Sequence, residues 1–256
     1  MTGRNAAASL RARYQAQTRA ILKHLAGLPE VAMRIATFGD ELSKRGAIEA
    51  VWILEILIRG VLRHDRESQI LYAGLVAPER LMGRMDEGRL DAMLSAGRDE
   101  RCIAAVQWLL SPIARTSEQA VEAEILVDKN LRDMPLGSRR ALARRARGEN
   151  INRLVKDPDA GVVANLLNNP YVLEATVLKI CSSRPTVSAA LEAVLRSPRW
   201  GHRYRIRWAL VKNPYLAQKI AVNLLPLLTR RDLKSVRDDE SLTSTLRLAA
   251  QRLLDL

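Results

Sequence analysis

The sequence predicts an all-α fold, and two observations carry this prediction. The first is a repeat: residues 162–182 and 206–226 each read as an apolar helix, then Asn-Pro-Tyr, then a second apolar helix, at an offset of 44 residues. The second is composition, because aromatic residues make up only 4% of the chain and strands favour aromatic and β-branched side chains. A unit repeated at this length is typical of proteins built from stacked helices.

Gly and Pro divide the apolar periodicity into separate helices. The most apolar helix covers residues 47–63, and its apolar positions span more than one face, so we expect burial on two sides. Glu49 and Glu55 lie within it, and we expect both carboxylates to reach the surface. We expect a break at Gly97-Arg98-Asp99. Around the two repeat copies, the expected helices cover residues 5–26, 29–45, 47–63, 68–77, 80–85, 90–96, 101–110, 117–127, 138–147, 187–195, 231–236 and 241–254.

The repeat region carries helix-start signals at its prolines. Asp157-Pro158 places an N-cap residue before a proline at the first helical position, where the missing N–H costs nothing. Asn169-Pro170 and Asn213-Pro214 are expected to end one helix and cap the next in the same way. Tyr171 and Tyr215 follow directly, and we expect them to cover the turn.

The net charge of +13 is confined to one half of the chain. Residues 1–128 contain 17 basic and 17 acidic side chains, whereas residues 129–256 contain 24 and 11. We therefore divide the chain into a neutral helical region at 1–128, either separate or made of degenerate repeats, and a basic repeat region at 129–256. The basic half either faces an acidic partner, which could be a protein, nucleic acid or anionic membrane surface, or reflects codon bias toward Arg.

The two cysteines and the hydropathy pattern indicate in which cellular compartment to expect the protein. Cys102 and Cys181 each lie in an apolar helical context and have no Cys or His at ligand spacing, so buried free thiols are expected, with a disulfide left open. The run at 47–62 is interrupted by charges and is shorter than the roughly 20 residues a spanning helix needs. No signal-peptide pattern follows the basic start. A cytoplasmic protein without a membrane span is expected.

The second half resembles a known class of helical repeat. The resemblance rests on Asp157-Pro158, on residues 166–170 (Leu-Leu-Asn-Asn-Pro), on residues 210–214 (Leu-Val-Lys-Asn-Pro) and on Leu224-Leu225-Pro226. These resemble the bacterial leucine-rich-repeat variant and related HEAT-like or armadillo-like arrays, over roughly residues 150–256. The resemblance implies a right-handed α-solenoid of stacked antiparallel helix pairs used for binding. The cysteine cluster that holds an iron–sulfur centre in the leucine-rich-repeat variant has no counterpart here.

Basic and aromatic residues gather in two stretches that are candidates for a binding surface. Residues 196–207 combine five Arg with Trp, Tyr and His, a mixture suited to phosphate contact and stacking, and we place this stretch in an inter-helix loop. Residues 139–147 add a second basic patch. The opposing interpretation is that the aromatic rings cap the core and the arginines are solvated or paired. The candidate residues are Arg140, Arg144, Arg147, Arg199, Trp200, Arg203, Tyr204 and Arg207.

No catalytic constellation is present in the sequence. The three His residues are isolated, no metal-ligand spacing occurs, and there is no Gly-rich phosphate loop. We therefore predict no enzyme activity, no catalytic residue, no cofactor and no metal. The favoured function is a helical-repeat scaffold that binds a protein partner through its concave or basic surface. The alternative is a nucleic-acid-binding HEAT-like protein, whose most specific form resembles the alkylpurine DNA glycosylases, although no catalytic Asp can be aligned.

Overall fold

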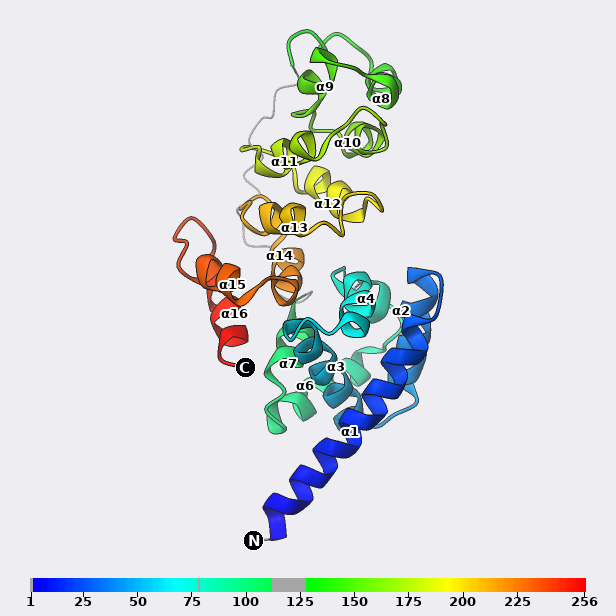
Figure 1. Cartoon of the computed structure of the whole chain (residues 1–256), viewed down its shortest axis with the longest axis vertical. Helices are drawn as coiled ribbons and strands as arrows, with labels where there is room; N and C mark the ends of the chain where they lie inside the picture. The colour runs from blue at the N-terminus through cyan, green and yellow to red at the C-terminus, as the bar shows by residue number, and fades with distance from the viewer. Residues whose placement is uncertain (1, 78, 112–127) are drawn as a thin grey trace. The chain divides into compact units, whose positions relative to one another are not determined.

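The computed structural model describes residues 2–77, 79–111 and 128–256, and every secondary-structure element in these ranges is a helix (Figure 1). The all-α prediction is therefore confirmed. The helix expected at residues 117–127 lies outside the described residues. None of the described helices combines the length and the apolar character needed to cross a membrane.

Packing divides the chain into two compact units. Unit 1 comprises Met1–Arg115, Val222–Lys234 and Leu248–Leu256, and unit 2 comprises Thr116–Ala221 and Ser235–Arg247. The second half of the sequence therefore contributes two segments to unit 1. The division at residue 128 rests on charge, and as a domain boundary it stays a prediction.

Unit 1 is organised around its most apolar helix. α3 packs against α1, α4, α6, α7 and the short 3-10 helix η1 (Leu225–Leu227). Val51, Ile53, Leu54 and Glu55 are all buried, and at about 100° per residue they span more than one face of α3, so the expected burial on two sides is confirmed. The complete helices of this unit are α1 (Thr2–Ala26), α2 (Val31–Ser43), α3 (Ala47–Leu62), α4 (Arg66–Leu75), α5 (Glu79–Met82), α6 (Glu87–Asp99) and α7 (Ile103–Leu110).

Gly97 has a different role from the one its sequence context suggested. The expected break at residues 97–99 does not occur, because α6 continues through Gly97 to Asp99. A Cβ atom at Gly97 would lie 2.6 Å from Cγ2 of Val106 in α7. The glycine therefore allows two helices to approach closely instead of ending one.

Glu55 is buried, contrary to the expectation that its carboxylate reaches the surface. Its side chain is 1% exposed, and its Oε1 accepts a hydrogen bond from Nε of Arg59 at 2.7 Å. Its Oε2 accepts from the backbone N–H of Ala105 at 2.9 Å, in the first turn of α7. Because the N-cap residue of α7 supplies no side-chain cap, Glu55 caps that helix from α3. Glu49 is 27% exposed and pairs with Arg45 at the surface edge.

In unit 2, helices two apart in the chain are neighbours in space. α10 packs against α8 and α12, and α11 packs against α13, so two rows of short helices run side by side (Figure 1). The complete helices of this unit are α8 (Leu136–Arg145), α9 (Glu149–Leu154), α10 (Ala160–Leu167), α11 (Glu174–Ser182), α12 (Ser188–Arg196) and α13 (Tyr204–Val211). α14 (Gln218–Leu224), α15 (Arg230–Arg237) and α16 (Ser244–Leu254) carry residues of both units.

The two copies of the Asn-Pro-Tyr motif form the same pattern of hydrogen bonds. Nδ2 of buried Asn169 donates to the carbonyl oxygens of Ala143 and Ala146, both at 2.9 Å, at the end of α8. Nδ2 of buried Asn213 donates to the carbonyl oxygens of Cys181 and Ser183, at 2.7 and 3.1 Å, at the end of α11. Each Asn thus satisfies carbonyl groups that a helix end leaves without a partner.

The motif geometry corrects two expectations about helix starts. Neither Asn caps the following helix, because the Oδ1 of each accepts instead from the Tyr two residues later. Asp157 does not cap α10 either: Asp159 does so through the N–H of Val162, and Asp157 is buried against Arg139 at 2.9 Å. Between the two motifs lie three helices, α11, α12 and α13, so the interval of 44 residues is longer than one helix pair.

Candidate functional site

The first Asn-Pro-Tyr motif presents two side chains to solvent. The loop between α10 and α11 is fixed by Asn169, whose Oδ1 accepts the N–H of Tyr171 at 2.9 Å. Val172 is completely buried, while Tyr171 is 49% exposed and Leu173 is 68% exposed. Because the buried residue lies between them, Tyr171 and Leu173 both project away from the core. Large apolar side chains that are exposed beside each other indicate an interaction surface, whereas a single exposed one is common on any protein.

Arg147 covers Tyr171 from the end of α8. Its guanidinium carbon lies 4.2 Å from the centroid of the Tyr171 ring, and its Nη2 donates to the Tyr171 hydroxyl. This cation–π contact joins the segment after α8 to the loop after α10. The side chain of Arg147 remains exposed.

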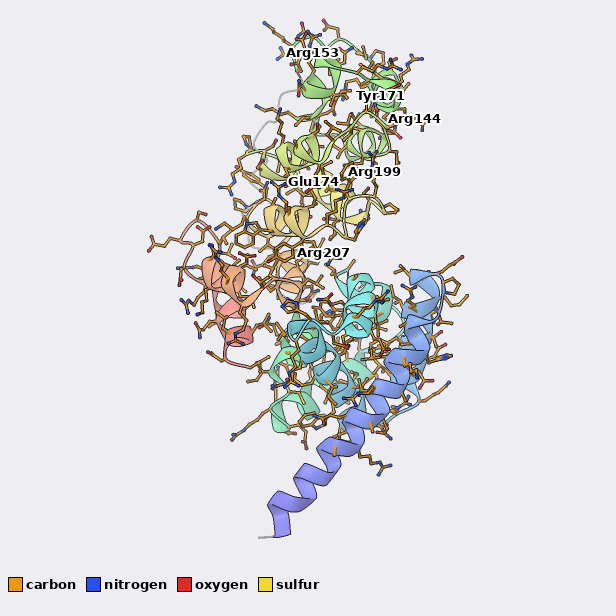
Figure 2. The ribbon with its side chains drawn as sticks, viewed as in Figure 1. Arg144, Arg153, Tyr171, Glu174, Arg199 and Arg207 are labelled. Carbon is orange, nitrogen blue, oxygen red and sulfur yellow. The ribbon has the colours of Figure 1, made fainter. Side chains whose placement is uncertain are left out.

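Arg199, which follows this loop in the chain, also binds it. Its Nη1 donates to the carbonyl oxygen of Asn169 at 3.1 Å and its Nη2 to that of Val172 at 3.2 Å. Arg199, an exposed residue, thus brings a second positive charge to the loop that carries Tyr171 and Leu173. We call Arg147, Tyr171, Leu173 and Arg199 the Tyr171 face; Figure 2 labels Tyr171 and Arg199 among the side chains of unit 2.

Trp200 belongs to the core rather than to an exposed surface. It is 2% exposed, and its Nε1 donates to the carbonyl oxygen of Leu167 at 2.9 Å. The guanidinium carbons of Arg199 and Arg203 lie 4.5 and 4.7 Å from its ring centroid. The alternative in which the ring caps the core therefore describes Trp200, and its ring is not exposed for stacking on a ligand.

Arg203 is neutralised within the chain. Its Nη1 pairs with Oε2 of Glu174 at 2.5 Å, at the first residue of α11; Glu174 is labelled in Figure 2. Arg205 approaches the other oxygen of Glu174 at 3.9 Å. The stretch at 196–207 is only partly a loop, because α13 begins at Tyr204; Tyr204 is 39% exposed there.

Arg140 and Arg207 are also committed to internal contacts. Arg140 makes a two-bond fork with Asp159, with both nitrogen–oxygen distances at 2.9 Å. That hydrogen bonding lowers the pKa of Asp159 and raises the pKa of Arg140. Arg207 is half-buried and donates to the carbonyl oxygen of Gly201 at 3.0 Å, and burial lowers the pKa of its guanidinium.

Arg144 differs from Arg140 although both lie on α8. Its Nε donates to the amide oxygen of Asn165 at 3.2 Å, and its guanidinium is exposed. Within the described residues, no carboxylate lies within ion-pair distance of Arg144, Arg147 or Arg199. These three therefore retain their positive charge for an outside partner.

A separate hollow of unit 2 is lined by cations and hydroxyls. Lys156, Lys179 and Arg184 surround a cavity of about 450 Å³ with Ser182 and Ser183. Arg184 also donates to the carbonyl oxygen of Lys212 at 2.6 Å.

Of the predicted site residues, Arg147 and Arg199 are brought together on one loop. Trp200 packs beneath that loop, Arg203 pairs with Glu174 at the surface, and Arg207 bonds to the carbonyl oxygen of Gly201. Sequence reasoning missed Leu173 altogether and treated Tyr171 only as part of the repeat. Tyr171-Val172-Leu173 is apolar throughout, so the sequence carries no signal for which of the three side chains is exposed. In the described part of the chain, no group of three or more His, Cys, Asp or Glu side chains is arranged to hold a metal ion.

Comparison with known proteins reveals no relative. A scan against protein-family models, a search of curated proteins and a search of solved structures each returned no match. Function is therefore inferred from the residues and contacts of this chain alone.

Proposed function

We propose that this chain is a non-enzymatic helical-repeat protein whose Tyr171 face binds an acidic, partly apolar segment of a protein partner. The observation that carries the proposal is the exposure of Tyr171 and Leu173 between Arg147 and Arg199, two guanidiniums without a carboxylate partner among the described residues. Tyr and Arg are the side chains most enriched at energetically dominant positions of protein interfaces. Leu173 adds the apolar contact that a purely electrostatic surface would lack.

Ion pairs within unit 2 reduce the number of its arginines that are available to a partner. Arg139, Arg140, Arg196 and Arg203 each pair with a carboxylate of unit 2, so these four guanidiniums are engaged within the fold. Arg147 and Arg199, in contrast, place positive charge beside the exposed apolar side chains of the Tyr171 face. Such a surface attracts an acidic chain and then buries its apolar side chains.

We also propose that unit 2 is an α-solenoid of the HEAT-like type, and that the protein acts in the cytoplasm. The packing of α10 against α8 and α12, and of α11 against α13, supports the first point. The second is supported by Cys102 and Cys181, which are both buried free thiols.

The test is binding of a fluorescein-labelled peptide in which Asp and Glu alternate with Leu and Phe, measured by fluorescence anisotropy with the full chain. We expect Tyr171→Ser/Leu173→Ser to weaken binding about tenfold or more, since loss of an interface anchor costs more than about 1.4 kcal/mol. Leu136→Ser is the matched control, because Leu136 is 39% exposed in the same unit and lies outside the face. Equal binding by all three proteins, or no binding at low salt, would refute the proposal.

The second candidate function is binding of nucleic acid, and the hollow lined by Lys156, Lys179 and Arg184 favours it. Cations beside hydroxyl groups suit phosphate oxygens, and such binding weakens steeply with salt. A labelled single strand and a labelled duplex distinguish the candidates: Lys156→Glu/Lys179→Glu abolishes DNA binding if this hollow is used. The glycosylase form receives no support from Trp200, whose ring is buried.

A further inference from the structure

Unit 1 contains a cavity that the Tyr171 face does not involve. It has a volume of about 600 Å³ and lies among α1, α3 and the start of α4. Cavities of roughly 300–1,000 Å³ are the size that small-molecule ligands occupy. Four arginines line it, namely Arg19, Arg59, Arg63 and Arg66.

The backbone between α3 and α4 places two of these arginines close together. His64 adopts a left-handed conformation with φ of 61°, and the N–H of Asp65 returns to the carbonyl oxygen of Gly60 at 2.9 Å. This tight turn ends α3 at Leu62 and starts α4 at Arg66, so that Arg63 and Arg66 flank it. A Cβ at Gly60 would lie 2.3 Å from Oγ of Ser68, and therefore only glycine permits this approach of the two helices.

Most of the positive charge in the cavity wall is unpaired. Arg59 pairs with Glu55, but the exposed side chains of Arg19, Arg63 and Arg66 form no ion pair with the described residues. The carboxylate of Asp65 caps α4 through the N–H of Ser68 at 2.8 Å, and Glu67 is the only other acid in the wall among the residues described.

Arg66 occupies an electrostatically unfavourable position. It is the first residue of α4, where the helix dipole favours negative charge. Because the carboxylate of Asp65 already caps this helix start, a bound anion near Arg66 would interact favourably with the guanidinium. Three guanidiniums without acid partners suit phosphate, which accepts paired N–H donors from several directions.

Another part of the wall is apolar and contains a planar ring. Leu22 and Ile56 line it together with Trp52. The Trp52 ring stacks on Tyr14, with centroids 6.3 Å apart and planes inclined at 23°, and its Nε1 donates to Glu100 at 3.2 Å. These two contacts fix the orientation of the ring, so it offers a preformed contact to a flat apolar group.

We propose that this cavity binds a small organic phosphate with a planar apolar body. Arg19, Arg63 and Arg66 hold the phosphate, and Leu22, Trp52 and Ile56 contact the planar part. The site shares no residue with the Tyr171 face, so each proposal can fail without the other.

Isothermal titration calorimetry with the full chain tests the proposal, with phenyl phosphate and adenosine 5′-monophosphate as probes. Both are expected to bind, about tenfold or more tightly than inorganic phosphate, because the ring adds apolar contact. Adenosine without its phosphate is expected to bind at least about tenfold more weakly. Absence of heat with both organic phosphates, or equal affinity for inorganic phosphate, would overturn the assignment.

Paired charge reversals locate the binding. Arg63→Glu/Arg66→Glu is expected to weaken phenyl phosphate by about a hundredfold, since two phosphate donors become repulsive groups. Arg98→Glu/Arg252→Glu makes the same change in net charge at exposed positions outside the cavity, and should leave affinity within about twofold. Equal losses in both double variants would mean that the phosphate senses only net charge and would overturn the proposed site. Circular dichroism establishes that each variant is folded.

Discussion

Replacing Asn169 by alanine is expected to destabilise unit 2 more than any exposed substitution in the same loop. Asn169 is completely buried and makes three hydrogen bonds, two to carbonyl groups at the end of α8 and one to the N–H of Tyr171. Alanine leaves all three backbone groups without that partner. The loop that carries the Tyr171 face loses its anchor at the same time.

The expected loss of unfolding free energy follows from the number of hydrogen bonds that Asn169 makes. Each intramolecular hydrogen bond contributes about 1 kcal/mol net, and an unsatisfied buried group costs at least as much. Three bonds therefore correspond to about 3 kcal/mol of unfolding free energy. Asn169→Asp should cost more at neutral pH, because a carboxylate cannot donate and would face two carbonyl oxygens.

Urea unfolding followed by circular dichroism and Trp fluorescence measures the loss. Asn168→Ala is the matched control, since Asn168 is exposed beside Asn169. Asn213→Ala should behave like Asn169→Ala, because Asn213 makes the equivalent three bonds. If Asn169→Ala costs no more than Asn168→Ala, the motif is not an anchor and the reasoning is wrong.

Three further predictions concern other parts of the chain. Glu55→Gln should lower stability to urea by about 2 kcal/mol, because an amide facing Arg59 cannot form the ion pair; a change under about 0.5 kcal/mol would contradict this. A hydrogen bond from Lys212, assisted by Ser241, lowers the pKa of Asp239 to about 2, so its contribution to stability is present above about pH 4 and is lost as pH falls toward 2. Acid titration should show this loss, and Lys212→Ala should flatten it; an unchanged profile refutes the pairing. Burial raises the pKa of Cys181 to about 12, so a disulfide reagent at pH 8 should label it only after urea is added, and rapid labelling of the native chain would show that the thiol is accessible.

Local signals in the sequence are sufficient to place most of the helices. Apolar periodicity and prolines predicted most of the helices, including the two-sided burial of α3, because these properties act over a few neighbouring residues. The doubled Asn-Pro-Tyr identified a repeated structural device. Even there, the hydrogen-bond partners of Asn169 were misassigned, since the carbonyl groups it binds lie more than 20 residues earlier.

The sequence by itself determined the fold class, the sum of charge and the ends of most helices. Only the tertiary structure decided which charges remain available. Arg140 and Arg147 look alike in the sequence, yet one is paired with Asp159 and the other covers Tyr171. The same holds for Glu55, which lies buried because Ala105 and Arg59 offer it donors. Pairing depends on distances between residues far apart in the chain, and composition and periodicity carry no information about those distances.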